Sequence, residues 1–192
     1  AGGRTFIGNI EVVEDGIRKN HNDVMMYSPI GKMDIFPYST VLGEGNILTL
    51  TTGDGDEIIA LESLDNKILQ FKRNIMYVMD ISSGEPGTFY VDSRNLYKGI
   101  ESKEHVCVTE DGIFWYNNNG AFLYDGDEIV NVMIREGDKD EGGVNRIDLD
   151  TWAKFVNKDS ISGYNPKSKE VIICKKSQVR DFENSDYDGD SD

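Results

Sequence analysis

With 192 residues, 38% of them hydrophobic and 10% aromatic, the chain is long enough for one domain or two small ones and apolar enough to build a core. Its formal net charge of −15 opposes binding to nucleic-acid phosphates and to anionic lipid headgroups. No apolar run approaches the roughly 18 residues of a membrane span, so we expect no membrane insertion.

Short β-strands separated by turn residues dominate the first third of the chain. Residues 4–10 and 23–29 read as strands, with a polar loop over 14–22 between them. Residues 46–52 and 57–62 flank a Gly-Asp-Gly-Asp run, which is typical of a hairpin turn. We therefore predict a hairpin between these two segments.

Three more hairpins follow along the chain. The predicted strand pairs are 67–73 with 74–81, 112–116 with 121–125, and 162–165 with 170–174. The middle pair has the clearest signal, because its Asn-Asn-Asn-Gly turn contains the Asn-Gly step that favours a tight turn.

Aromatic residues mark a repeat in these hairpins. Tyr27, Phe71, Trp115 and Tyr164 are spaced 44, 44 and 49 residues apart. A β-rich period of roughly 40–50 residues is typical of propeller blades. We predict an all-β fold with one short helix, a β-propeller-like repeat of small antiparallel sheets that forms an incomplete portion of a larger propeller; a sandwich is the alternative.

The predicted domain covers residues 1–180. Its blade-type units lie near residues 4–29, 46–82, 104–134 and 160–176.

One helix interrupts the strands, near residues 150–157. Asp150 is the expected N-cap, and Trp152, Phe155 and Val156 share one face at helical spacing. We expect this helix to pack over the sheet edge between the third and fourth units. The charged, Gly-rich stretch 135–145 before it reads as an exposed loop.

Residues that could carry chemistry are few. Cys107 and Cys174 are too few for a disulfide framework or a zinc site, so buried free thiols are expected, with a single disulfide as the alternative. His21 and His105 lack a Ser or Cys partner in a nucleophile motif. We therefore expect no catalytic, cofactor-binding or metal-binding residue, and no enzyme activity.

The acidic end, residues 181–192, reads as a tail or as a truncated next unit. Asp186, Asp188, Asp190 and Asp192 alternate around a Gly, and alternating carboxylates in a tight turn can wrap Ca²⁺. An ordinary acidic terminus or inter-strand turn explains the same residues, so calcium binding stays open.

Several stretches together resemble a known family. These are residues 3–10, 23–29, 34–37, 58–64, 69–78, 112–126, 163–166 and 170–173, together with Trp152. The chain resembles the tail nozzle proteins of short-tailed bacteriophages, also described as tail tubular protein B-like β-propeller proteins. The resemblance extends from about Gly3 to Cys174, and it consists of strand patterns without a chemical signature.

The resemblance implies a structural virion protein that is made in the host cytoplasm and located in the tail. Such subunits form a homo-oligomeric ring, usually a hexamer, below the portal and adaptor and near the fibres. DNA is ejected through its central channel without specific binding. Family members are several times longer, so we expect the chain to be part of something longer or a shortened relative.

Two other functions remain as alternatives. A carbohydrate-binding or host-receptor-binding propeller domain could stack sugars on Tyr116, Tyr124 and Tyr187. A calcium-dependent extracellular β-domain would use the terminal aspartates.

Overall fold

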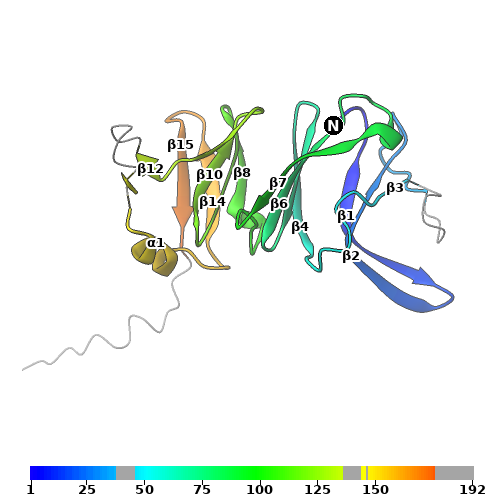
Figure 1. Ribbon diagram of the computed structural model, residues 1–192, viewed down its shortest axis with the longest axis horizontal. Helices are drawn as coiled ribbons and strands as arrows, with labels where there is room; N and C mark the ends of the chain where they lie inside the picture. Colours follow the sequence, from blue (N-terminus) through cyan, green and yellow to red (C-terminus); the bar gives the residue numbers. More distant parts are fainter. Residues whose placement is uncertain (38–45, 136–143, 146, 176–192) are drawn as a thin grey trace, which may run out of the picture.

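The computed structural model describes residues 1–37, 46–135, 144–145 and 147–175 (Figure 1). Short antiparallel strands account for nearly all of the regular structure, and the described part contains one short α-helix. The predicted all-β, propeller-like fold is therefore confirmed. None of the described helical segments is long and apolar enough to cross a membrane.

The strands form four main sheets, which we number in chain order. Sheet I contains β1 (Phe6–Glu14), β2 (Ile17–Tyr27) and β3 (Ile47–Leu48). Sheet II contains β4 (Ile58–Leu64), β5 (Lys67–Lys72), β6 (Ile75–Asp80) and β7 (Tyr90–Leu96). Sheet III contains β8 (Val106–Thr109), β9 (Gly112–Asn117), β10 (Gly120–Tyr124) and β11 (Ile129–Asn131). Hairpin IV contains β14 (Ile161–Asn165) and β15 (Glu170–Cys174).

The remaining elements are short connections. They are the 3₁₀ turns η1 (Pro86–Thr88) and η2 (Lys103–His105), the two-residue strands β12 (Ile134–Arg135) and β13 (Val144–Asn145), and the helix α1 (Leu149–Phe155).

The four sheets stand side by side in an open row, from hairpin IV at one end to sheet I at the other (Figure 1). Their first strands begin 52, 48 and 55 residues apart. Sheets II and III are simple meanders, and the chain passes from the last strand of one to the first strand of the next. The first strands of sheets I and II contact each other, β1 with β4, and so do those of sheet III and hairpin IV, β8 with β14. This chain path is the one that propeller blades use.

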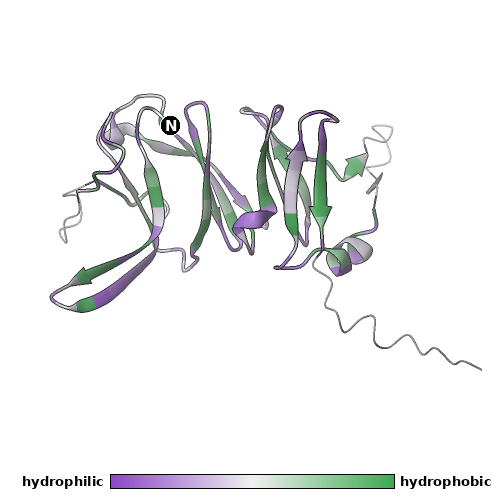
Figure 2. Ribbon diagram, turned by 180° about the vertical axis from the view of Figure 1, so that it is seen from behind, coloured by the Kyte–Doolittle hydropathy of each residue, from purple (hydrophilic) through white to green (hydrophobic). Residues whose placement is uncertain are grey.

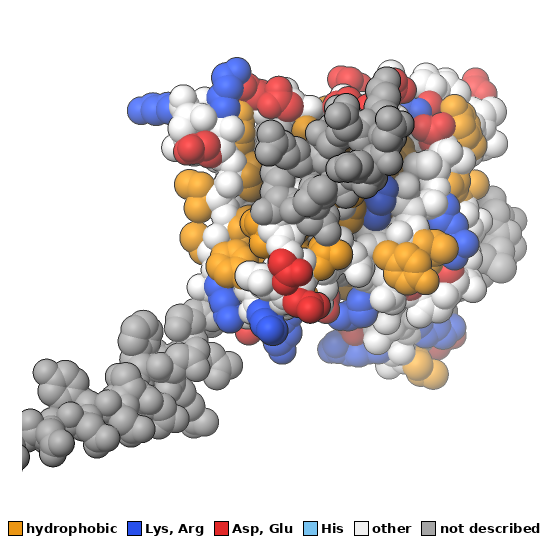
Figure 3. All heavy atoms as spheres, turned by 60° about the vertical axis from the view of Figure 1, so that its left-hand side comes forward, with side chains coloured by type: hydrophobic (Ala, Val, Ile, Leu, Met, Phe, Trp, Pro, Cys, Tyr) orange, Lys and Arg blue, Asp and Glu red, His pale blue; other side chains and the backbone are white. Residues whose placement is uncertain are grey.

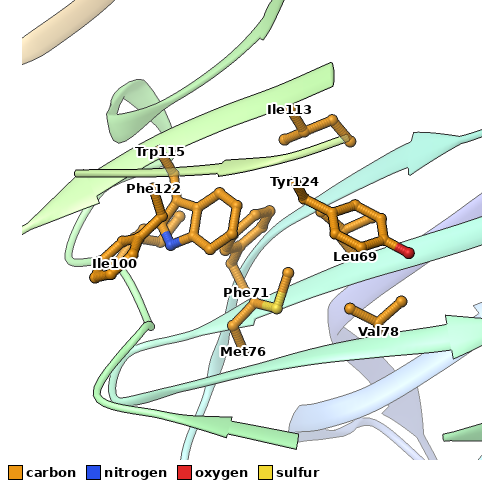
Figure 4. Close-up of a cluster of buried hydrophobic side chains, with 9 residues drawn as sticks. All are labelled: Leu69, Phe71, Met76, Val78, Ile100, Ile113, Trp115, Phe122 and Tyr124. Carbon is orange, nitrogen blue, oxygen red and sulfur yellow. The ribbon is translucent and has the colours of Figure 1, made fainter. Parts of the chain in front are cut away.

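Hydrophobic stretches run within strands throughout the row (Figure 2). Strand β6 is buried along its whole length, because sheet II is covered on both faces. Toward sheet III, sheet II presents Leu69, Phe71, Met76 and Val78. These side chains pack with Trp115 and other apolar residues on the sheet III side (Figure 4). We call this contact the II–III joint.

Toward sheet I, sheet II presents the opposite face of the same strands. Ile58, Ile68 and Met79 pack there with Met25 and Leu48 of sheet I. The close approach of the two sheets depends on Gly8, where an added Cβ would lie 3.1 Å from the side chain of Ile58. We call this contact the I–II joint.

Two sequence predictions about sheet I were wrong. Strands β1 and β2 are joined by Asp15 and Gly16 at φ 51° and 78°, so residues 17–22 continue β2 and do not form a loop. Strand β3 pairs with β2, through Met25 opposite Leu48, and not with β4. The Gly-Asp-Gly-Asp run is therefore a connection between sheets. The other three predicted hairpins are confirmed.

Sheet II runs from Ile58 to Leu96, whereas the sequence placed its unit near 46–82. Strand β7 accounts for the difference, because its polar, alternately exposed residues gave no strand signal.

The aromatic markers that defined the predicted repeat are not at equivalent positions in the sheets. Phe71 and Trp115 lie in second strands, but Tyr164 lies in a first strand.

The helix is confirmed, with a different cap. The Asp148 side chain accepts a hydrogen bond from the Thr151 amide at 3.0 Å, so Asp148, not Asp150, is the N-cap. Trp152 and Val156 are buried against sheet III and hairpin IV as expected, while Phe155 is 40% exposed.

The stretch 135–145 was expected to be a loop. At its two ends, Arg135 pairs with Val144 in a short antiparallel ladder, and residues 136–143 lie outside the described residues.

Candidate functional site

The tyrosines proposed for sugar stacking do not lie on the surface. Tyr116 is 0% exposed and Tyr124 is 2% exposed, because both face joints between sheets. Stacking on a sugar by these two residues is therefore ruled out. Tyr187 and the four terminal aspartates lie outside the described residues. Among the residues that are described, no cluster of three or more His, Cys, Asp or Glu has the spacing of a metal site.

The Cys107 thiol of β8 and the His105 imidazole of η2, just before that strand, are held in apolar surroundings. Burial raises the pKa of the Cys107 thiol, so a reactive thiolate is disfavoured. Burial also lowers the pKa of His105, which stacks on Tyr116 with 4.7 Å between ring centroids. Its Nε2 lies 3.1 Å from the Asn157 carbonyl oxygen. This arrangement holds a neutral imidazole in a structural position.

The two cysteines are free. Cys107 is half-buried, as expected for a core thiol, but Cys174 is exposed because it lies on the outward face of the edge strand β15. The expectation of two buried thiols was therefore wrong for Cys174.

A buried ion pair links sheet II to the loop that precedes it. Lys72 is fully buried, and its Nζ donates to the Thr51 carbonyl at 2.6 Å and to Asp54 Oδ1 at 2.7 Å. Tyr77 donates to Asp54 Oδ2 at 2.8 Å. Burial alone would raise the pKa of Asp54, but the hydrogen bonds from Lys72, the Asp56 amide and Tyr77 outweigh it and lower the pKa.

Asp56 binds the turn between β5 and β6 from the same loop. Its carboxylate accepts hydrogen bonds from the amides of Glu57, Arg73 and Asn74, at 3.1, 3.2 and 2.7 Å. Asp54 and Asp56 thus fasten the connection from sheet I onto the end of sheet II. The sequence signal was present, since Lys72 stands at an inward position of an apolar strand, where an unpaired lysine would be costly.

A second charged cluster lies on the other end of sheet II. Lys67 donates to Asp80 at 2.8 Å and to Asp92 at 2.9 Å, and Ser82 donates to Asp80 from its amide at 2.8 Å. The hydrogen bonds from Lys67 and Ser82 lower the pKa of Asp80 strongly. This cluster ties β5, β6 and β7 together across the sheet.

A well-defined hollow lies between sheet III and hairpin IV, at the contact that we call the III–IV joint. Its volume is about 500 Å³. It is lined by Phe114, Ala121, Leu123, Val132, Met133, Trp152, Tyr164, Val171 and Ile173, with Thr109, Asp111 and Lys169 at its polar side. Figure 3 shows hydrophobic side chains exposed at this end of the row. An apolar, aromatic-lined concavity of this size is typical of a binding surface.

Polar atoms without partners also concentrate at the III–IV joint. His105 Nδ1, Tyr116 Oη and Tyr164 Oη are buried and have no hydrogen-bond partner. Elsewhere among the described residues, this is true of the Gln70 amide group alone. The packing of hairpin IV on sheet III is therefore less complete than that of sheets II and III. The sequence did not reveal this incomplete packing, because the packing of a joint depends on how many strands of the two sheets face each other.

Comparison with known proteins found no family model and no curated protein that matches this chain.

Proposed function

We propose that the chain is a non-enzymatic structural module of a bacteriophage tail, forming part of the nozzle through which DNA is ejected. The observation that carries the proposal is the chain path, in which each small sheet passes from its last strand to the first strand of the next in an open row. A row of this kind is an arc of a propeller or ring. Its strand patterns are those that resemble the tail nozzle proteins.

The charge of the chain supports passage of DNA without binding. The net charge is −15, and we place the channel-facing edge at the first strands. Glu62 on β4 and Glu104 next to β8 line one hollow of about 390 Å³ on that side, together with Lys103. Because like charges repel, such an edge lets a phosphate backbone slide without adhering.

A protruding arm supports assembly with neighbouring subunits or tail proteins. The β1–β2 hairpin extends away from the row (Figure 1) and carries Val13 and Ile17, which are 65% and 63% exposed. An isolated two-stranded hairpin is marginally stable in water, so exposed apolar residues on it favour docking onto another surface. We propose a homo-oligomeric ring that contacts the portal, adaptor and fibres.

The mass of the native assembly tests this proposal. We expect native mass spectrometry to give a closed multiple of the chain mass, and Val13→Asp with Ile17→Asp to shift it toward smaller species. Val108→Asp, at a similarly exposed position on β8, is the matched control and should leave the assembly unchanged. A free monomer of 21.6 kDa that never enters virions would overturn the proposal.

A further inference from the structure

Tyr97, directly after β7, has a backbone conformation that a tyrosine disfavours. Its φ is 62°, in the left-handed region, where the Cβ of an L-residue crowds the following carbonyl oxygen. Asn and Asp tolerate this conformation best, whereas a bulky residue is strained by it. The other non-glycine residues with positive φ in the described part are Asn9, Asp15, Asp65 and Lys169, and none of these is aromatic.

Burial does not compensate for this strain. Tyr97 is 73% exposed, the largest value for any large hydrophobic residue in the described part of the chain. Within that part, its hydroxyl has no hydrogen-bond partner and its ring has no aromatic neighbour. Backbone strain persists where the surrounding contacts enforce it, and it is concentrated at binding sites.

The backbone that carries the ring is fixed from both sides. The side-chain amides of Asn117 and Asn119, at the β9–β10 turn, donate to the Tyr97 carbonyl at 2.9 and 3.1 Å. Two residues further on, Gly99 lies so close to the end of β5 that an added Cβ would collide with the Lys72 carbonyl oxygen. The ring is thus presented on a rigid base between sheets II and III, and a rigid base reduces the entropy lost on binding.

The residues around the ring are mainly polar and provide amide groups. Asn118, between the two asparagines that hold the Tyr97 carbonyl, is exposed and makes no hydrogen bond within the described part. Asn119 uses its Nδ2 for the Tyr97 carbonyl and keeps its side-chain oxygen available. In residues 95–100, Leu96 is the one other exposed apolar side chain, at 51%.

The charge and polarity of this surface narrow the kinds of ligand that fit. A net charge of −15 opposes nucleic acid and anionic lipid. A stable protein interface has an apolar core and buries roughly 800 Å² on each partner, which one ring and one leucine do not supply. An exposed ring beside free amides suits a small uncharged ligand that has both a C–H face and hydroxyl groups.

We propose that Tyr97 anchors a binding site for a neutral oligosaccharide. The ring stacks on the C–H face of one sugar unit, and the amides of Asn118 and Asn119 bond to its hydroxyl groups. This site differs from the one predicted with Tyr116 and Tyr124, which face joints between sheets. The inference does not depend on the proposed role in a phage tail.

Ligand-observed NMR of the full chain with maltohexaose, cellohexaose and lactose tests the proposal. We expect saturable binding of at least one of these neutral sugars, with a Kd of about 1 mM or lower. Because the sugar is uncharged, the Kd should change by less than about twofold between about 50 mM and about 500 mM salt.

Variants separate the role of the ring from that of the fold. Tyr97→Asn removes the ring and relieves the backbone strain, so we expect at least tenfold weaker binding together with a Tm that is higher by about 1–3 °C. Tyr97→Trp keeps an aromatic face and should bind within about threefold of the unaltered chain. Tyr90→Asn changes an exposed tyrosine at the other end of β7 and is the matched control, which should leave binding unchanged.

The proposal is overturned if none of the three sugars binds, or if Tyr97→Asn binds as tightly as the unaltered chain. A lower Tm for Tyr97→Asn also overturns it, because the ring would then have a structural role. Hydroxyl-radical footprinting of the assembled chain provides a further check: a shielded Tyr97 would mean that a protein interface, and not a sugar, covers the ring. These readouts do not use the mass of the assembly, so failure here is distinguishable from failure of the proposed tail function.

Discussion

The II–III joint and the III–IV joint are built from the same sheet but differ in completeness. At the II–III joint, four strands face four strands, and the polar atoms of the aromatic side chains are satisfied: Trp115 donates to the Lys98 carbonyl at 2.9 Å and Tyr124 to the Gly126 carbonyl at 2.8 Å. At the III–IV joint, two strands and α1 face four strands, and a hollow and three unpartnered polar atoms remain. The number of opposing strands, more than the hydrophobicity of the residues, decides how well a joint is filled.

The largest expected effect comes from truncating the centre of the complete joint. Trp115→Ala removes a ring that contacts Phe71 at 5.2 Å between centroids, and it leaves a cavity, so we expect a loss of about 3–5 kcal/mol in the free energy of unfolding. Ile173→Ala, beside the existing hollow, should cost about 1 kcal/mol or less, because its side chain is only half-buried. Urea unfolding of both variants tests the comparison. Equal losses would show that the two joints are equally well packed.

The next largest effect is expected at the I–II joint, where a charge is buried. Asp54→Ala leaves the fully buried Lys72 without its carboxylate, so we expect a loss of about 3 kcal/mol. Adding Lys72→Met should restore most of the stability, because an apolar side chain replaces the unpaired charge. Asp159→Ala, which removes an exposed carboxylate, is the control and should change stability by less than about 0.5 kcal/mol. Failure of the double variant to recover would contradict the assigned role of Lys72.

The sequence predicted the local elements well and their partners less well. The 112–125 hairpin was visible because its strands are apolar and its turn is specific. The pairing of β3 with β2 was missed, because Gly53-Asp-Gly-Asp looks like a turn, while its carboxylates in fact bind Lys72 and the β5–β6 turn. These bonds join residues about 18 positions apart, and local patterns carry no such information.

The hollow was equally hidden from the sequence. Its lining residues, such as Phe114 and Val171, read as ordinary strand residues, and the hollow arises from how the described strands of sheet III and hairpin IV face each other. Tyr116 and Tyr124 show the converse error, since aromatic residues near a turn were interpreted as exposed when both face a joint.

A smaller effect is expected from pH, and it is confined to the III–IV joint. Burial lowers the pKa of His105 below its unfolded value of 6.5, and the hydrogen bond with the Asn157 backbone, Glu101 and Glu104 offset this only in part. As the pH falls below 6.5, the unfolded chain gains a proton that the folded chain does not, so stability decreases until the folded pKa is reached. The slope is at most about 1.4 kcal/mol per pH unit.

Denaturation between about pH 7.5 and about pH 5 measures this slope, at pH values where the carboxyl groups of Asp54 and Asp80 remain ionised. His105→Gln keeps a donor toward the Asn157 carbonyl and should remove the slope while leaving stability near pH 7.5 nearly unchanged. The same slope in the variant would mean that another group is responsible.

The smallest effect is expected at the rim of the III–IV joint. Lys169 and Glu110 form an exposed ion pair there, with side chains 69% and 41% exposed. The charges are well solvated, so Lys169→Ala or Glu110→Ala should change the free energy of unfolding by no more than about 0.5 kcal/mol, and less at high salt. A double-mutant cycle at low and high salt measures the coupling. A coupling well above 1 kcal/mol would mean that the rim, and not the apolar wall of Val171 and Ile173, holds hairpin IV against sheet III.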